Sequence, residues 1–222
     1  LNPDEVVRMI DQKFSYWKPK EVKLYNPPAE APLAKIQTVE VFGPTPDNVR
    51  LGYRLPGALD VKASILATIC DEVMSNSAAG LIDLNLNKQQ KILGGGSGLN
   101  ELKDYSVWSL FGRPKKGQSL EEVKDLLLGQ VEKLKRGEWD EKMLTAIVNN
   151  YKLNAIRELE NNYSRVNPLL EAFINDKGES WLDYNRRLDL MSKVTKQQVV
   201  DFANQWLKDN YVIVYKRKGE DK

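Results

Sequence analysis

Apolar and polar side chains alternate strictly between residues 48 and 55. Val49, Leu51, Tyr53 and Leu55 alternate with polar residues or glycine, which is the pattern of a β-strand with one buried face. The predicted strands span residues 36–43, 49–55, 91–98, 104–111 and 210–217. A proline-containing turn joins the first two strands, and we expect these two to pair as an antiparallel hairpin. The third and fourth strands form a second expected pair.

Apolar residues recur at helical spacing in most of the remaining chain. This spacing predicts helices over residues 3–16, 59–75, 79–89, 139–160, 164–176, 181–191 and 196–208. A further helix begins after Ser119 and ends before Gly137. Ser119 with Glu122, and Thr195 with Gln198, have the spacing of capping boxes, which fix where these two helices begin.

The order of these elements indicates an α+β fold. Strands occur mostly in pairs, helices occur in long blocks, and no βαβαβ alternation is present. We therefore predict a largely antiparallel sheet with helices packed on one face. Four prolines lie between residues 18 and 34, and proline fixes φ and removes a backbone donor. The chain is divided into a helix at 1–17, a proline-rich connector at 18–34 and a single α+β domain at 35–222.

Composition excludes several classes of function. The 222 residues include 33 Lys and Arg, 31 Asp and Glu, one Cys and no His, for a formal net charge of +2. Because the two signs are mixed along the chain, we expect no nucleic-acid partner. No apolar run approaches the roughly 18 residues of a membrane span. Without histidine the chain has no His general base and no zinc motif of the HExxH or HxxEH type, so we expect no catalytic and no metal-binding residue in it.

The other residues that could carry chemistry are interpreted as structural. The glycine-rich residues 94–98 lack the Lys-Ser or Lys-Thr that a phosphate-binding loop requires, and we interpret them as a place where a strand bends or another backbone approaches. Cys70 falls on the apolar stripe of a predicted helix, which favours a small buried hydrophobe. Trp139 and Trp181 lie near helix starts and are interpreted as packing anchors. The carboxylates are interpreted as solvated groups on helix faces, as at Glu121.

The order of segments resembles that of a known family. The opening LNPDEVVRMIDQKFSYWK resembles the segment G-D-(L/V)-x-P-E-E-V…(I/V)-x-x-x-F of the insulinase, pitrilysin and mitochondrial processing peptidase family, the inverzincin zinc peptidases. Four later segments follow in the order of that family's second lobe: TVEVFGPTPDNVRLGYRLPG, LATICDEVMSN, GLIDLNLNKQQKILGGGSG and RPKKGQSLEEVKDLLLGQVEKLKRGEWDEKML. The resemblance spans nearly the whole chain.

The resemblance implies a non-catalytic lobe of a zinc metalloendopeptidase. The parent protein would hold zinc by an HxxEH motif in a lobe upstream of Leu1, residues 1–17 would be the last helix of that lobe, and residues 35–222 would wall the substrate chamber. The catalytic lobe and a peptide substrate are then the expected partners, with no cofactor in this segment. In the family, an L-R-x-x-x-x-L-G-Y segment carries an Arg and a Tyr that hold the substrate. The resemblance places this segment at residues 84–94, where the Arg and the Tyr are absent. From this correspondence we expect Asn85, Lys88 and Lys91 to contact the substrate.

Two alternatives stay open. One is a scaffold protein of the same fold without peptidase activity, which the core subunits of the respiratory complex resemble; the other is an unrelated α+β binding module. An HxxEH motif upstream of Leu1 would favour the peptidase.

If a strand that precedes Leu1 is missing, its neighbours expose unpaired backbone groups, and we expect weak self-association. The expected compartment is the cytoplasm or a bacterial envelope space, with the periplasm favoured.

Overall fold

The computed structural model describes residues 1–21, 23, 28–176 and 181–219, and the chain divides into two units, Leu1–Pro32 and Leu33–Lys222. The first unit contains helix α1 (Pro3–Lys13), which begins where Asn2 Oδ1 accepts a hydrogen bond from the Asp4 N–H at 3.0 Å. Proline at the first helical position and acidic residues in the first turn suit this start. The predicted helix is therefore present and ends three residues early, at Lys13 instead of residue 16.

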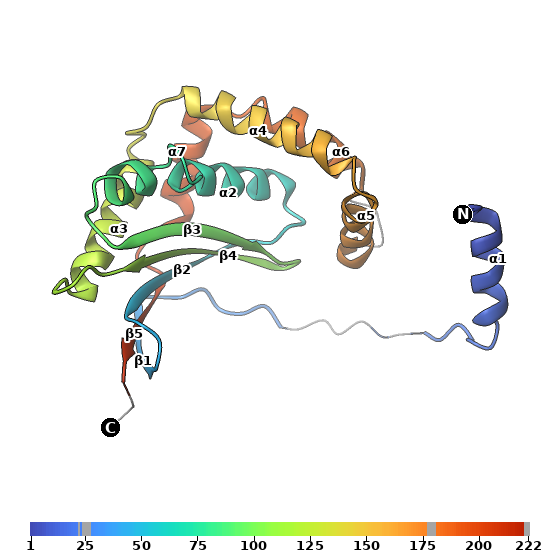
Figure 1. Cartoon of the computed structure of the whole chain (residues 1–222), viewed down its shortest axis with the longest axis horizontal. Helices are drawn as coiled ribbons and strands as arrows, with labels where there is room; N and C mark the ends of the chain where they lie inside the picture. Colours follow the sequence, from blue (N-terminus) through green and yellow to red (C-terminus); the bar gives the residue numbers. More distant parts are fainter. Residues whose placement is uncertain (22, 24–27, 177–180, 220–222) are drawn as a thin grey trace. The chain divides into compact units, whose positions relative to one another are not determined.

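The second unit is built on one five-stranded sheet (Figure 1). Its strands are β1 (Gln37–Gly43), β2 (Asn48–Pro56), β3 (Gly94–Glu101), β4 (Tyr105–Arg113) and β5 (Val212–Lys218). They lie in the order β1-β5-β2-β4-β3, and only the pairing of β1 with β5 is parallel. The predicted single, largely antiparallel sheet is confirmed, as is the pairing of the third and fourth strands.

The expected hairpin between β1 and β2 is wrong, because β5 lies between these two strands. Strand β5 buries Ile213 and Tyr215 and pairs on both sides, as a central strand does, whereas the residues of β1 are almost all exposed. The turn that joins β1 to β2 is wide enough to pass across one strand. The Lys216 ammonium of β5 donates hydrogen bonds to carbonyl oxygens of this turn, to that of Gly43 at 3.1 Å and also to that of Thr45.

The helices match the predicted segments within a few residues. They are α2 (Val61–Met74), η1 (Asp83–Asn87, a π-helical turn), α3 (Leu120–Lys135), α4 (Lys142–Glu158), α5 (Asn162–Asp176), α6 (Trp181–Met191) and α7 (Lys196–Trp206). Both predicted capping boxes are present, at Ser119 and at Thr195. Gly137 follows α3 with a φ of +69°, the left-handed conformation that favours glycine at a helix end.

Two layers of helices lie on one side of the sheet (Figure 1). Helices α2, α3 and α7 contact the strands, while α4 and α6 pack on α2. The strand residues that face the helices form the core, and they include Leu51, Tyr53 and Trp108. Cys70 is only 3% exposed, which confirms its interpretation as a buried hydrophobe, and Trp139 belongs to the same core.

The glycines of the sheet confirm close backbone approach in the 94–98 segment and reveal another case on β4. A Cβ at Gly95 would lie 2.7 Å from Ile92 Cδ1 and 2.8 Å from the Phe111 carbonyl oxygen. At Gly112, where α3 packs on the sheet, a Cβ would lie 2.5 Å from Val123 Cγ1. Both glycines therefore allow packing that no larger residue permits.

We expect Gly112→Ala to destabilise the domain by about 1–3 kcal/mol, because the added methyl group forces α3 away from the sheet. The control is Gly98→Ala, since no atom lies within 4 Å of a Cβ built there, and its effect should stay within about 0.5 kcal/mol. Urea unfolding of the two variants measures both free energies. Equal effects of the two substitutions would contradict the packing argument.

Candidate functional site

The side of the sheet that faces away from α2, α3 and α7 (Figure 1) is a surface of the second unit. We call it the uncovered face; it carries the odd-numbered residues of β1 and β4 and the even-numbered residues of β2, β3 and β5. The register fixes this assignment, because it pairs Val39 with Val214, Arg50 with Val214 and with Phe111, and Phe111 with Gly96. The neighbouring positions in β2 and β4 point into the core and are buried.

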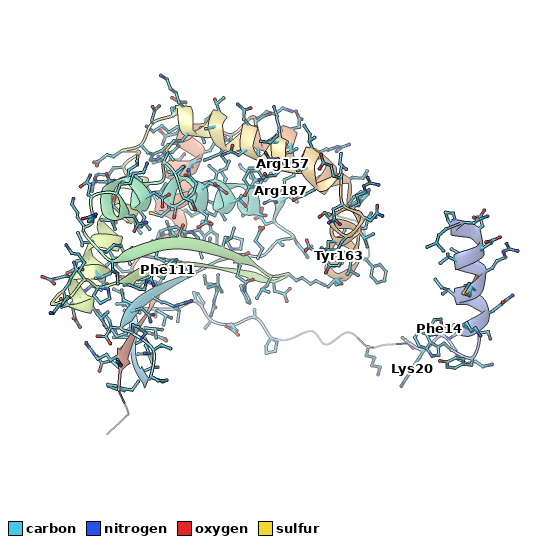
Figure 2. All side chains as sticks on the ribbon, viewed as in Figure 1. Phe14, Lys20, Phe111, Arg157, Tyr163 and Arg187 are labelled. Atoms are coloured by element: carbon cyan, nitrogen blue, oxygen red, sulfur yellow. The ribbon has the colours of Figure 1, made fainter. Side chains whose placement is uncertain are left out.

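The uncovered face presents apolar side chains to solvent. Val107 is 41% exposed and Phe111 39%, and Val39 and Val41 are exposed to a similar degree. Figure 2 labels Phe111 on the sheet. An apolar sheet surface on a chain whose mean hydropathy is −0.50 is typical of a surface that contacts another protein or a ligand.

A row of small residues crosses the middle of the uncovered face. The register places Gly52 of β2 beside Ser109 of β4, and Ser109 beside Gly98 of β3. No atom lies within 4 Å of a Cβ built on either glycine. Because β-strands are about 4.8 Å apart, this row gives three adjacent strands an accessible backbone surface. Arg50 and Phe111 stand on one side of it, Arg54 and Val107 on the other.

The predicted contact residues lie elsewhere, on and after η1. The Asn85 side-chain amide donates to Gln130 Oε1 of α3 at 2.8 Å, and the Lys88 ammonium donates to the Ala78 carbonyl at 2.7 Å. Lys91 is exposed, and its carbonyl accepts from the Gln118 amide at 3.0 Å. The structure therefore directs the three residues to three different partners within the domain.

Sequence reasoning overlooked Asn87, which lies between the predicted residues. Its side-chain amide donates to the Gly95 carbonyl at 2.8 Å, and its Oδ1 accepts from the Gly95 N–H at 3.0 Å. This pair of bonds occupies the outer backbone groups of β3 in the way that a further strand would. An exposed edge strand is a template for pairing with other chains, and Asn87 blocks this edge at Gly95. The sequence holds no signal that separates Asn87 from Asn85.

A partly buried polar cluster joins α2, β3 and α6. The Arg187 guanidinium donates to Ser64 Oγ and to Thr68 Oγ1, each at 2.8 Å, and its Nη2 lies 3.7 Å from Glu101 Oε2. The Ser64 hydroxyl in turn donates to Glu101 Oε1. Figure 2 labels Arg187 among the helices. The cluster ties α6 to the sheet through α2.

The interpretation of the carboxylates as solvated groups is wrong for three of them. Asp83 is buried and accepts from Ser75 Oγ and from the N–H groups of Asn76 and Gly80. Asp71 accepts from Trp108 Nε1 at 2.8 Å, and Glu72 from the Tyr151 hydroxyl at 3.3 Å. These groups stay on α2 and in the turn after it because each one satisfies backbone or side-chain donors that burial has removed from water.

Burial changes the acidity of the two α2 carboxylates. It raises the pKa of Asp71, an effect that hydrogen bonds from Ser97, Trp108 and the Leu99 N–H partly offset. Burial also raises the pKa of Glu72, and the nearby Asp71 charge raises it further, while the hydrogen bond from Tyr151 lowers it. Both residues face the helix layers and are separated by the sheet from the uncovered face.

The described residues offer no metal centre. Among residues 1–21, 23, 28–176 and 181–219, no group of three or more Cys, Asp or Glu side chains could hold a metal ion, and the chain has no His. In the same part of the chain, no helix is both long and apolar enough to cross a membrane.

Comparison with known proteins identifies the relatives of this fold. The sequence model of a family described as the peptidase M16 inactive domain matches residues 1–151. A protease from Helicobacter pylori has the same fold, with a TM-score of 0.87 at 18% identity over 98% of this chain and 53% of that one. The peptidase M16 inactive domain from Pseudomonas fluorescens gives a TM-score of 0.76 at 15% identity over 100% of this chain and 53% of that one.

A third solved structure, the periplasmic protease PqqL from Escherichia coli, gives a TM-score of 0.72 at 11% identity over 97% of this chain and 25% of that one. At these identities the likeness to solved structures shows the fold alone. The chain spans about half, or less, of the length of these three structures. No curated protein sequence matches it.

The raised pKa of Glu72 predicts how the stability of the domain depends on pH. The folded pKa of Glu72 is raised, so its contribution to stability is fully present below its ordinary pKa and is lost as the pH rises through the folded value. Glu72→Gln stays uncharged and keeps an acceptor for Tyr151. We therefore expect the variant to be more stable than the wild type at about pH 8, and the difference to shrink towards about pH 4.

Urea unfolding of the wild type and the variant at several pH values measures this difference. Glu158→Gln, on the exposed surface of α4, is the control and should show a much weaker pH dependence. A difference between Glu72→Gln and the wild type that grows on acidification would contradict the expected sign.

Proposed function

The chain belongs to the peptidase M16 inactive domain family, and we propose that its uncovered face forms one wall of the chamber in which a zinc endopeptidase holds its peptide substrate. The observation that carries this proposal is a sheet covered by helices on one side and open, with exposed Val39, Val107 and Phe111, on the other. The family match identifies the chain as an inactive domain. We infer that such a domain contributes to peptide hydrolysis through a surface that contacts the substrate.

The residues of this chain do not fit a zinc ion. The chain has no histidine, and the described carboxylates and cysteine form no group that could hold a metal. In our proposal the zinc belongs to the catalytic lobe, and no step of peptide hydrolysis is assigned to this chain. Its part is to hold an extended peptide in position and to exclude water from it, which lowers the entropic cost of reaching the reactive geometry.

The architecture supports this role. A sheet backed by two helix layers is a rigid wall, and the row of Gly52, Ser109 and Gly98 leaves backbone accessible for an extended peptide. We place the longer protein in a bacterial envelope space, in agreement with the description of one structural relative as a periplasmic protease. Cys70 is buried and free, and this arrangement is compatible with such a compartment.

We also propose that Asn85, Lys88 and Lys91 contact the substrate or the catalytic lobe beside the start of β3. The support is their place in the segment that resembles the family's gripping motif, together with the exposure of Lys88 and Lys91. Asn85 also donates to Gln130, and this bond fixes the loop that carries the two lysines.

The wall is tested by filling the uncovered face. In the longer protein that contains the catalytic lobe, Gly52→Trp places a large ring over the row of small residues without meeting any atom at its Cβ. We expect kcat/KM for a fluorogenic peptide to fall by about tenfold or more, with zinc content and unfolding temperature unchanged. Lys142→Trp, on the exposed side of α4, is the control.

Normal turnover by a folded Gly52→Trp protein would refute the proposal that the uncovered face forms a wall of the substrate chamber. A wild-type longer protein that binds no zinc and cleaves no peptide would instead favour the scaffold alternative of the same fold.

The η1 segment is tested separately in the same assay. We expect the double variant Lys88→Ala, Lys91→Ala to raise KM several-fold with little change in kcat, because each exposed contact contributes about 1 kcal/mol or less to binding. Lys133→Ala, which removes a lysine from the surface of α3, is the matched control. Unchanged kinetics in the double variant would remove these residues from the site.

A further inference from the structure

The two edge strands of the sheet, β3 and β1, differ in what their outer backbone groups bind. On β3, the Asn87 side chain binds the Gly95 N–H and carbonyl, and the Asp71 carboxylate accepts a hydrogen bond from the Leu99 N–H. Helix α2 and η1 both contact this strand. The outer edge of β3 is therefore occupied from within the domain.

The outer edge of β1 is open. The Gln37 N–H donates to the Tyr211 carbonyl at 3.0 Å, so Gln37 and the other odd-numbered residues of β1 direct their backbone groups to β5. The even-numbered residues of the strand point the other way. The N–H and carbonyl groups of Thr38, Glu40 and Phe42 therefore face outward, and none of these backbone groups has a hydrogen-bond partner among the described residues.

Strand β1 lacks the features that usually protect an edge. Natural edge strands are blunted by proline, by lysine or by a bulge. The segment Gln37–Gly43 contains no proline and no lysine, and its register with β5 runs without a bulge. Its one charged side chain, Glu40, is paired with Arg217 at 2.9 Å, and Val39 is exposed. Such an edge is a template for pairing with another strand.

We propose that β1 pairs antiparallel with β1 of a second copy of this chain, about a two-fold axis at Val39. In this register Val39 faces Val39 of the second copy, an apolar pair. Thr38 faces Glu40 of the second copy, and its hydroxyl can donate to that carboxylate. Phe42 faces Ile36, the residue before the strand, which makes a second apolar pair. The facing residues with outward backbone groups exchange two hydrogen bonds each.

The neighbouring registers match the side chains less well. An axis at Glu40 would place two Glu40 carboxylates directly opposite each other, and like charges in this position destabilise a sheet. An axis at Thr38 would set the Glu40 carboxylate against Ile36. An axis at Val41 would set it against Phe42. The sequence of β1 is thus self-complementary in one register, as an isologous two-fold contact requires.

This two-fold axis runs normal to the sheet. The pairing joins two five-stranded sheets into one continuous sheet and keeps the uncovered faces of both copies on the same side. It is independent of the proposed function, and it gives the self-association expected from the sequence a specific strand. Because one pair of strands buries little surface, we expect a weak dimer that forms at high protein concentration.

Cysteine cross-linking of the intact chain tests the register. Facing residues that share no hydrogen bonds in an antiparallel pair have Cα atoms about 4.5 Å apart, which is within the range of a disulfide. With oxidised glutathione as the oxidant, we expect Val39→Cys to give at least tenfold more covalent dimer than Val41→Cys. The latter is the matched control, because its two thiols would lie about 13 Å apart along the strands. The native Cys70 is buried and should not react.

Each other outcome of the cross-linking contradicts the proposal. Dimer from Val41→Cys alone, or equal amounts from both variants, would overturn the register. The absence of dimer from both variants would overturn the pairing itself.

Sedimentation equilibrium measures the dimer without introduced cysteines. The apparent mass of the wild-type chain should rise from 25.3 kDa towards twice that value with increasing concentration. Thr38→Pro removes an outward N–H that binds nothing within the domain, so the far-ultraviolet circular dichroism should not change. The variant loses two hydrogen bonds per dimer and should dimerise about tenfold or more weakly.

The control for association through another surface is Phe173→Ser, on the exposed apolar side of α5, which should leave the dimer unchanged. A dimer that Phe173→Ser weakens and Thr38→Pro does not would overturn the pairing. A wild-type chain that stays monomeric at millimolar concentration would overturn it as well.

Discussion

The burial of α2 between the sheet and the outer helices is the constraint on which the rest of the domain depends. Ten of its 14 residues are buried, so the polar side chains that are buried with them require partners inside the protein. Those partners come from three different elements: Trp108 of β4 for Asp71, Tyr151 of α4 for Glu72, and Arg187 of α6 for Thr68. One helix thus orders both helix layers of the second unit on its side of the sheet (Figure 1).

Local signals in the sequence were sufficient for the elements but not for their neighbours. The alternation through β2 and the capping boxes act within a few residues, and the structure has each of them in place. The insertion of β5 between β1 and β2 depends on a contact between residues far apart in the chain, which alternation does not encode. The prolines at positions 44 and 46 were the available hint, because they remove donors that a tight hairpin turn uses.

The candidate site was predictable in part. The alternation that assigned Val49 and Leu51 to the core also assigns Arg50 to the opposite face, so this face could be anticipated strand by strand. The way in which residues of different strands lie side by side on this face could not be anticipated. The row from Gly52 to Gly98 exists only through the register of β2, β4 and β3. The buried carboxylates of α2 had a signal that local reasoning passed over: a helix that is apolar on all sides must bury its acidic residues too.

The two faces of the sheet place different demands on sequence. On the helix side a single methyl group at Gly112 would collide with Val123, so residues there are fixed by packing. On the uncovered face, Gly52 and Gly98 have no atom near the place of a Cβ, and the side chains there can change without disturbing the core. In the proposed function, a lobe without catalytic groups can therefore adapt its charge and shape to a substrate while its fold stays constant, and the chemistry of the reaction can stay constant in the proposed catalytic lobe. This separation gives a physical reason to keep an inactive lobe joined to an active one.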